Sequence, residues 1–242
     1  MPRTKLALAI LLLLHVGSAS AKEPAIPNPY LLLIRDSFVH KEVGLTNQQI
    51  QSLRKITDKV DVNFWPLRHF GPAQNGGKVQ KLINSTKTQV QNVLSRQQSL
   101  RLEQIVLRSQ GIKCLLRKDV AQLIKMTPAQ RTKSVAAIEK LESELAGFYK
   151  QVQAGKPRAP LEKKAAELRQ STQKQLLALL KPTQKNSLGR LLGKQLDMTR
   201  IGQNLRYKAP EFATGNTWIS TKPLTMRQLR GKVVIVYFYA FG

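Results

Sequence analysis

Four short segments of this chain share a pattern that fixes where helices begin. Each has an apolar residue, then Thr or Ser in three of the four cases, and Gln three positions further on. The segments are Leu45-Thr46-Asn47-Gln48-Gln49, Leu94-Ser95-Arg96-Gln97-Gln98, Met126-Thr127-Pro128-Ala129-Gln130 and Leu180-Lys181-Pro182-Thr183-Gln184. A hydroxyl at an N-cap accepts a hydrogen bond from the first turn, and Gln at the third helical position bonds back to the cap. The pattern predicts four helix starts.

Apolar residues follow each of these starts at helical spacing, so the helices that they begin are amphipathic. Pro128 and Pro182 fit the first helical position, where a missing N–H costs nothing. Lys181 stands at the fourth cap, and this copy therefore lacks the side-chain bond there. The residues that we assign to the helix-capping motif are Thr46, Gln49, Ser95, Gln98, Thr127, Gln130 and Gln184.

The four segments belong to a longer internal duplication. Residues 39–49 align with residues 120–130 at an offset of 81, and residues 85–105 align with residues 171–191 at an offset of 86. Amphipathic helices in tandem must bury their apolar faces on each other, as a bundle or a curved array. We therefore expect a helical module over residues 22–208, with two halves at about 28–111 and 112–206.

The repeated segments resemble the LTxxQ motif of the Spy/CpxP-type periplasmic helical proteins. The resemblance covers about 180 residues and implies an all-helical fold. For the best-known members it also implies a basic concave surface that holds unfolded proteins. The alternative is that the motif serves only to start helices, because a capping box explains every position in it.

The charge of the chain points to an acidic partner. The sequence holds 40 Lys and Arg residues against 14 Asp and Glu residues, a formal net charge of +26. The excess lies mostly within residues 22–208, and it favours a broad electrostatic surface over solvated helix faces alone. Our candidate basic contact surface contains Arg54, Lys55, Arg117, Lys118, Lys163 and Lys164.

The N-terminus resembles an export signal. A basic start is followed by an apolar stretch over residues 6–14 and by Ala19-Ser20-Ala21, which predicts a signal peptide over residues 1–21. A membrane anchor is the alternative, but the stretch is too short to span a bilayer. We expect a periplasmic or secreted protein without a transmembrane segment after cleavage. Protein clients or anionic envelope components are the expected partners, and nucleic acid is not.

Residue types that carry redox or metal chemistry are scarce in the chain. The one cysteine, Cys114, excludes a disulfide scaffold and lies in an apolar run, so we expect a buried and inert thiol. His40 and His69 have no partner at ligand spacing, and we predict no metal and no cofactor. The aromatic stretch over residues 64–70 favours packing over a contact site.

The last 34 residues follow a different pattern. Ala209-Pro210-Glu211-Phe212 and Leu229-Arg230-Gly231-Lys232 precede an apolar run over residues 233–241, which predicts a buried strand. This segment resembles the start of a thioredoxin-like redoxin domain of the TlpA or alkyl-hydroperoxide-reductase type. The resemblance implies a Cys-x-x-Cys motif immediately after Gly242, and hence no catalytic residue within the chain. The alternative is that the strand docks on the helical module.

These patterns predict a mostly α-helical fold: a duplicated amphipathic array, then the first strand of an incomplete α/β thioredoxin-like domain over residues 209–242. The corresponding function is that of an exported thiol–disulfide or peroxide oxidoreductase with an N-terminal binding module. We expect the present residues to be inactive by themselves. The alternatives are a Spy-like holdase, a structural protein of the cell envelope held by anionic polymer or lipid, and, last, a DNA-binding protein.

Overall fold

The computed structural model describes residues 28–64, 66–67, 72–203, 205, 211–212 and 217–235. The described part of the chain is mostly helical, as the sequence predicts, and contains no strand. The expected signal peptide lies outside the described residues, as do His69 and much of the aromatic stretch around it.

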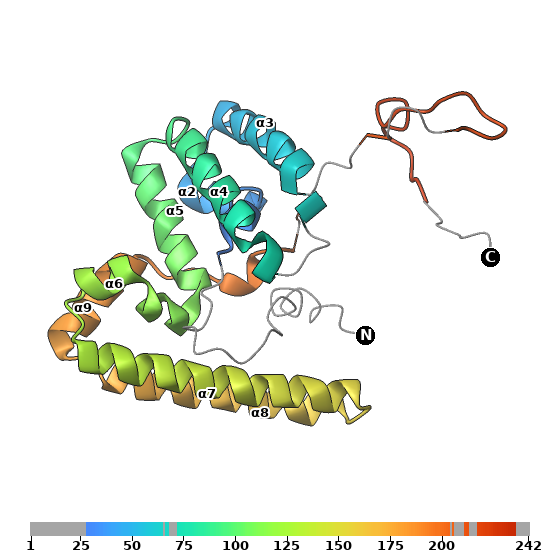
Figure 1. Cartoon of the computed structure of the whole chain (residues 1–242). Coiled ribbons are helices and arrows are strands. Elements are labelled where there is room, and N and C mark those ends of the chain that lie inside the picture. The colour runs from blue at the N-terminus through green and yellow to red at the C-terminus, as the bar shows by residue number, and fades with distance from the viewer. Residues whose placement is uncertain are drawn as a thin grey trace.

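In the first half of the helical region, the described residues form five α-helices around one core (Figure 1). They are α1 (Tyr30–Leu33), α2 (Ser37–Val43), α3 (Asn47–Phe64), α4 (Pro72–Gln91) and α5 (Arg96–Ser109). Leu33, Val90 and Ile105 are completely buried in this core. Asp36 caps α2 by accepting hydrogen bonds from the backbone N–H groups of Phe38 and Val39.

The second half repeats the order of the first around a core of its own. It consists of η3 (Gly111–Leu116), α6 (Lys118–Leu123), α7 (Pro128–Gln153), α8 (Arg158–Ala178) and α9 (Pro182–Leu192). Helix α5 belongs to both cores, because Val106 packs in the first core and Leu107 packs in the second. It also contacts α9, and so it joins the two halves.

Buried positions coincide when the two halves are aligned at the offsets found in the sequence. The matched pairs, all buried, are Val39 and Val120, Val43 and Ile124, Val60 and Leu141, Thr86 and Thr172, Val90 and Leu176, Leu94 and Leu180, and Leu102 and Leu188. The acidic partner of an ion pair keeps its place as well: Arg35 bonds Asp61 at 2.6 Å, and Glu142, which aligns with Asp61, is bonded by Lys113, which aligns with Leu32. The duplication therefore extends from the sequence to the packing.

The two halves differ most in their long helices. Helices α7 and α8 have 26 and 21 residues and lie side by side as a hairpin that extends past the small helices of its own half (Figure 1). Helices α3 and α4 have 18 and 20 residues and pack beside α2 and α5. The second half thus exposes a longer pair of helices than the first.

Residues 193–203 return to the first half and tie the two halves together. Leu196 and Ile201 pack against the first core, on either side of the short helix η4 (Met198–Arg200). The N–H of Gly202 donates to the carboxylate of Asp36 at 2.6 Å. The guanidinium of Arg200 lies 4.1 Å from the centre of the Phe38 ring. This segment therefore belongs structurally to the first half, although it follows the second in sequence.

The strand expected over residues 233–241 is not present in its described part. Residues 226–231 form turns, and residues 233–235 have no regular structure. Val233 and Ile235 are 95% and 89% exposed, whereas the sequence predicts a buried strand. A strand needs a hydrogen-bonded neighbour, and no strand exists in the described residues to provide one. The rest of the expected strand, from residue 236, lies outside the described residues.

Candidate functional site

The glutamines of the capping motif form a pair in the first half. Within the motif, the side-chain oxygen of Gln49 accepts from the N–H of Thr46 at 3.0 Å, and that of Gln98 accepts from the N–H of Ser95 at 2.9 Å. The two amides also bond each other reciprocally, at 2.7 and 3.0 Å. Each NH2 group donates once more across the pair, Gln49 to the carbonyl of Val93 and Gln98 to that of Gly44.

The second half contains the same arrangement. Gln130 and Gln184 bond each other at 2.9 and 3.0 Å, and each accepts from the backbone N–H of its own cap residue, Thr127 or Lys181. Their remaining N–H bonds go to the carbonyls of Leu179 and Lys125. Each glutamine therefore holds its own helix start and the loop that leads into the partner helix.

The paired glutamines show that the motif has a structural role in both halves. An amide side chain has two donors and one acceptor oxygen, and every glutamine of a pair uses both donors and accepts twice. A closed network of this kind fixes one relative position for two helix starts. The hydroxyls of Thr46, Ser95 and Thr127 add the expected cap bonds, each at 3.2 Å. These side chains have little bonding capacity left for a ligand.

The six residues of the candidate basic contact surface do not form one cluster of equivalent side chains. Arg54 and Lys55 are exposed on α3, Lys163 and Lys164 are exposed on α8, and Lys118 is exposed at the start of α6. Arg117 differs, because it is half-buried and forms ion pairs with Glu103 at 2.8 Å and with Asp119 at 2.5 Å. The hydrogen bond that Arg117 donates to Asp119 lowers the pKa of the Asp119 carboxyl. Arg117 thus fastens α5 to α6.

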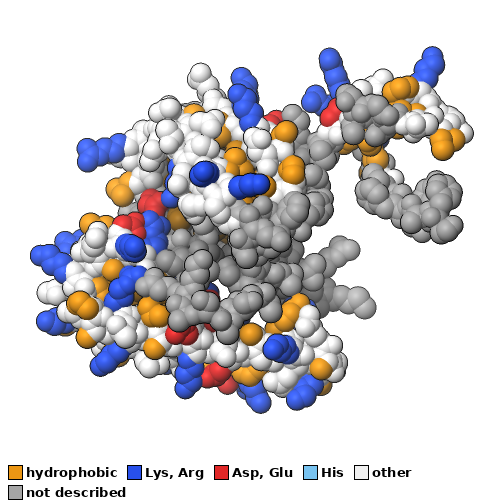
Figure 2. Space-filling view, in the orientation of Figure 1, with side chains coloured by type: hydrophobic (Ala, Val, Ile, Leu, Met, Phe, Trp, Pro, Cys, Tyr) orange, Lys and Arg blue, Asp and Glu red, His pale blue; other side chains and the backbone are white. Residues whose placement is uncertain are grey.

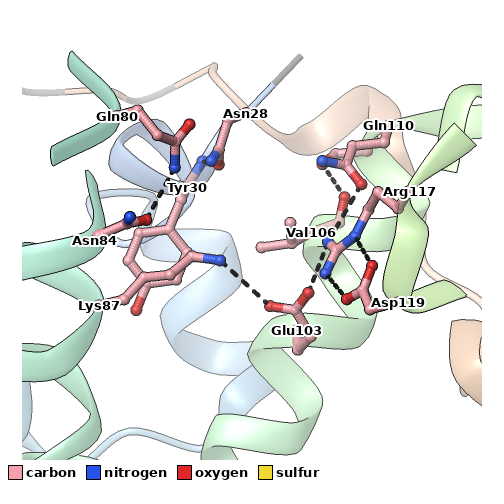
Figure 3. A network of polar contacts seen from close by, with 11 residues as sticks. Asn28, Tyr30, Gln80, Asn84, Lys87, Glu103, Val106, Gln110, Arg117 and Asp119 are labelled. Carbon is pink, nitrogen blue, oxygen red and sulfur yellow. Dashed lines mark hydrogen bonds and ion pairs between the residues drawn. The ribbon is translucent and has the colours of Figure 1, made fainter. Parts of the chain in front are cut away.

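Arg117 is part of a polar network between α4, α5 and α6 (Figure 3). Lys87 approaches Glu103 to 4.0 Å from the opposite side and lies 5.1 Å from the centre of the Tyr30 ring. These groups line a cavity of about 300 Å³. Burial, and then the negative charge of Glu103, raise the pKa of the Tyr30 hydroxyl. The cations and anions of this cavity neutralise one another, which favours a structural joint over an anion site.

Two arginines of α5 hold residues 193–203, which we call the return segment. The sequence pattern did not single out these arginines. Arg101 bonds Glu42 at 3.2 Å and the carbonyl of Lys194 at 3.0 Å. Arg108 donates to the carbonyls of Leu192 and Gly193, at 2.8 and 2.5 Å. Their only sequence signal is a spacing of seven residues on one helix, which places both on the same face.

The structure places Cys114 and His40 in packed surroundings. Cys114 is 2% exposed, and burial raises the pKa of its thiol to about 11, with a smaller opposing effect of Arg117. Ring atom Nε2 of His40 lies 2.8 Å from the carbonyl oxygen of Ile34. No group of three or more His, Cys, Asp or Glu side chains that could hold a metal occurs among the described residues.

The C-terminal segment contains the same pair of reciprocal Thr–Gln bonds at a turn, which the four-segment pattern does not include. Thr225 and Gln228 bond reciprocally, the N–H of Thr225 to the Gln228 side chain at 2.8 Å and the N–H of Gln228 to the Thr225 hydroxyl at 3.3 Å. Leu224 precedes Thr225, so this segment has the same spacing as the four earlier ones. Nearby, Phe212 and Trp218 form an edge-to-face pair with ring centres 5.2 Å apart.

The space-filling view shows many Lys and Arg side chains on the visible face, including a group over α6 and α9 (Figure 2).

Comparisons with known proteins give no match to a family model, to a curated protein or to a solved structure. None of the described helices is both long and apolar enough to cross a membrane.

Proposed function

We propose that the helical module binds protein clients outside the cytoplasm and that the segment from residue 209 begins a thioredoxin-like oxidoreductase domain. The observation that carries the first part is a surplus of exposed cations on a framework whose glutamine pairs and cores have structural roles. Lys55, Lys118 and Lys164 are examples on three different helices. Such a surface attracts chains with net negative charge over a wide area.

Scattered exposed apolar side chains also suit a client that is not folded. Val62 and Leu100 are 69% and 62% exposed in the first half, and Leu123 is 61% exposed in the second. An unfolded chain offers both charged and apolar groups, so a surface with isolated apolar residues among cations can contact both. Under this proposal the module holds a client, and the oxidoreductase domain acts on the cysteines of that client.

Support for the oxidoreductase domain comes from the residues of 209–242 and their resemblance to the redoxin start. In such a domain a cysteine thiolate attacks a disulfide, and a second cysteine resolves the mixed disulfide. Cys114 does not fit this role, because it is buried and its pKa is raised, which leaves little thiolate at neutral pH. Reading the coding sequence beyond codon 242 tests this part. A Cys-x-x-Cys motif in the next few codons supports it, and its absence contradicts it.

Client binding is tested by light scattering with reduced, unfolded α-lactalbumin, which is an acidic protein. At several-fold excess the chain should suppress aggregation, and the suppression should weaken as salt rises, because screening shortens the range of the attraction. An excess of lysozyme, which is basic but folded, serves as the control for charge alone. No suppression at any ratio, or equal suppression by the control, would contradict the proposal.

A further inference from the structure

Three lysines gather at the glutamine pair of the second half. The carbonyl of Lys125 accepts from the Gln184 side chain at 2.9 Å, and the N–H of Lys181 donates to the same side chain at 2.8 Å. The N–H of Lys185 donates to the carbonyl of Lys181 at 3.0 Å. The buried Gln184 side chain thus holds the backbone at Lys125 and Lys181, and Lys185 lies in the turn of α9 that follows; all three lysines are exposed. We call Lys125, Lys181 and Lys185 the lysine triad.

The first half has residues better suited to the local backbone at two of the three positions, those of Lys125 and Lys181. Gly44 aligns with Lys125, Ser95 with Lys181, and Ser99 with Lys185. Gly44 has a φ of 70°, in the left-handed region that glycine adopts without strain, whereas Lys125 has a φ of 55° in the same region. The second half therefore carries a strained residue where its own duplicate shows an unstrained one.

Lys181 is unfavourable for a second reason. The hydroxyl of Ser95 accepts a bond from the first turn of α5 at 3.2 Å, but a lysine ammonium has no acceptor, and the side chain of Lys181 makes no such bond. A positive charge at a helix N-terminus also opposes the helix dipole. Local rules are broken most often where a residue serves binding, so this departure from the duplicate indicates a function for the triad.

The positive charge of the triad is not neutralised within the described part of the chain. None of its three ammonium groups forms an ion pair with a described carboxylate, unlike Arg101 and Arg117, which are paired. Three like charges on adjacent segments repel one another, and an anionic partner relieves this repulsion. The same end of the molecule shows the group of blue side chains over α6 and α9 (Figure 2).

We propose that the lysine triad is a docking site for acidic segments of a protein client, an inference that rests on the proposed function. Charge complementarity favours Asp- and Glu-rich chain as the occupant. Ammonium groups on separate flexible stems act as point charges that can each meet one carboxylate along a chain. The triad lacks the planar fork of arginine, which holds a phosphate group through two bonds.

The test measures how a labelled ten-residue peptide of Glu, Asp and Gly binds to the full chain, by fluorescence anisotropy. The test variant, Lys125→Gly, Lys181→Ser and Lys185→Ser, takes its new residues from the first half, so the fold is retained. The control variant, Lys59→Gln, Lys78→Gln and Lys81→Gln, removes the same charge from exposed positions of α3 and α4. We expect the test variant to bind the peptide about tenfold more weakly, and the control variant to stay within about twofold of the parent.

Each outcome of this test decides the inference. Equal binding by the test variant and the parent, or equal loss in both variants, would overturn it. Binding of the parent to phosphatidylglycerol vesicles through the triad, without binding to the peptide, would also overturn it in favour of a membrane surface. The light-scattering assay keeps the two proposals apart. If the parent suppresses aggregation but the test variant binds the peptide as tightly as the parent, the proposal of client binding is retained and the proposal of a docking site at the lysine triad is rejected.

Discussion

The two halves of the helical region have the same framework and use it differently. Both place a glutamine pair between two helix starts, and both bury matched residues at matched positions. The first half has serine and glycine beside its pair, whereas the second half has the lysine triad. In the first half, Asp36 bonds the return segment. In the second half the aligned residue is Arg117, which has the opposite charge and pairs with carboxylates of α5 and α6.

This difference separates residues that the fold requires from residues that it tolerates. A feature present in both halves, such as the glutamine pair, is explained by packing and hydrogen bonding alone. A feature present in one half only, at some cost to local stability, needs another explanation. The first half thus serves as an internal reference for the second, and the variants below test what the two halves share and where they differ.

The largest expected effect comes from removing one glutamine of the buried pair. Gln184→Ala loses four hydrogen bonds and leaves the carbonyl of Lys125 and the amide of Gln130 without their partner. We expect the free energy of unfolding to fall by about 2–4 kcal/mol. Gln98→Ala in the first half should cost less, about 1–2 kcal/mol, because Gln98 is only partly buried and Ser95 still caps its helix. Urea unfolding of both variants measures the two values. A larger loss for Gln98→Ala would contradict the comparison.

The thiol of Cys114 should make the second core sensitive to alkaline pH. Cys114 aligns with Leu33, so the first core has no ionisable group at this position. Burial raises its pKa from 9.0 to about 11, so the unfolded chain loses the proton at a lower pH than the folded chain. Its contribution to stability is full below pH 9 and falls as pH rises to 11.

Comparison with Cys114→Ala isolates this contribution. The parent chain should lose about 2–3 kcal/mol more than the variant between pH 8 and pH 11, measured by urea unfolding. Parallel pH profiles for the two proteins would show that Cys114 is accessible to water and that its core is looser than the first.

Exchanging the cap residues between the halves should move stability in opposite directions. Lys181→Ser gives α9 the cap bond that it lacks, and we expect it to raise the free energy of unfolding by about 1 kcal/mol. Ser95→Lys removes the corresponding bond from α5 and should lower it by a similar amount. Thermal unfolding measures both shifts. If Lys181→Ser lowered the melting temperature, Lys181 would serve the fold, and the case for the lysine triad would weaken.

The smallest expected effect concerns the ion pair of Arg117 and Asp119. Bonding to Arg117 lowers the pKa of the Asp119 carboxyl, so its stabilising effect is present near pH 7 and is lost as pH falls through the lowered pKa of the folded state. The side chain of Asp119 is 57% exposed, which limits the effect to less than about 1 kcal/mol. Asp119→Asn should therefore destabilise the chain slightly at pH 7, and the difference should shrink below pH 4. A difference that grows in acid would exclude this role.

The sequence predicted the helix starts and the duplication because capping and apolar spacing are local signals. Thr127 and Gln130 lie three residues apart, and their roles follow from that distance alone. The bonds between Gln130 and Gln184 join positions 54 residues apart, and no local rule indicates them. Arg117 was grouped with exposed cations for the same reason, since its partner Glu103 is on another helix.

The C-terminal segment shows where a local signal is not sufficient by itself. The apolar residues Val233, Val234 and Ile235 favour a strand by composition, but a strand forms only when a neighbour bonds its backbone. Lys125 was missed because its strain is visible only in its φ angle, which the sequence does not contain. Comparison of Lys125 with Gly44 at the offset of 81 would have provided a hint.

A double-mutant cycle on the glutamines tests most directly whether each pair couples two helix starts. The cycle measures Gln130→Ala, Gln184→Ala and the double variant by urea unfolding. A second cycle across the two halves, with Gln49→Ala, Gln184→Ala and their combination, is the control, because Gln49 and Gln184 share no hydrogen-bond partner. We expect a coupling energy of about 1–3 kcal/mol within the pair and less than about 0.5 kcal/mol across the halves. Additive effects within the pair would contradict the account, because they would mean that the motif caps each helix separately.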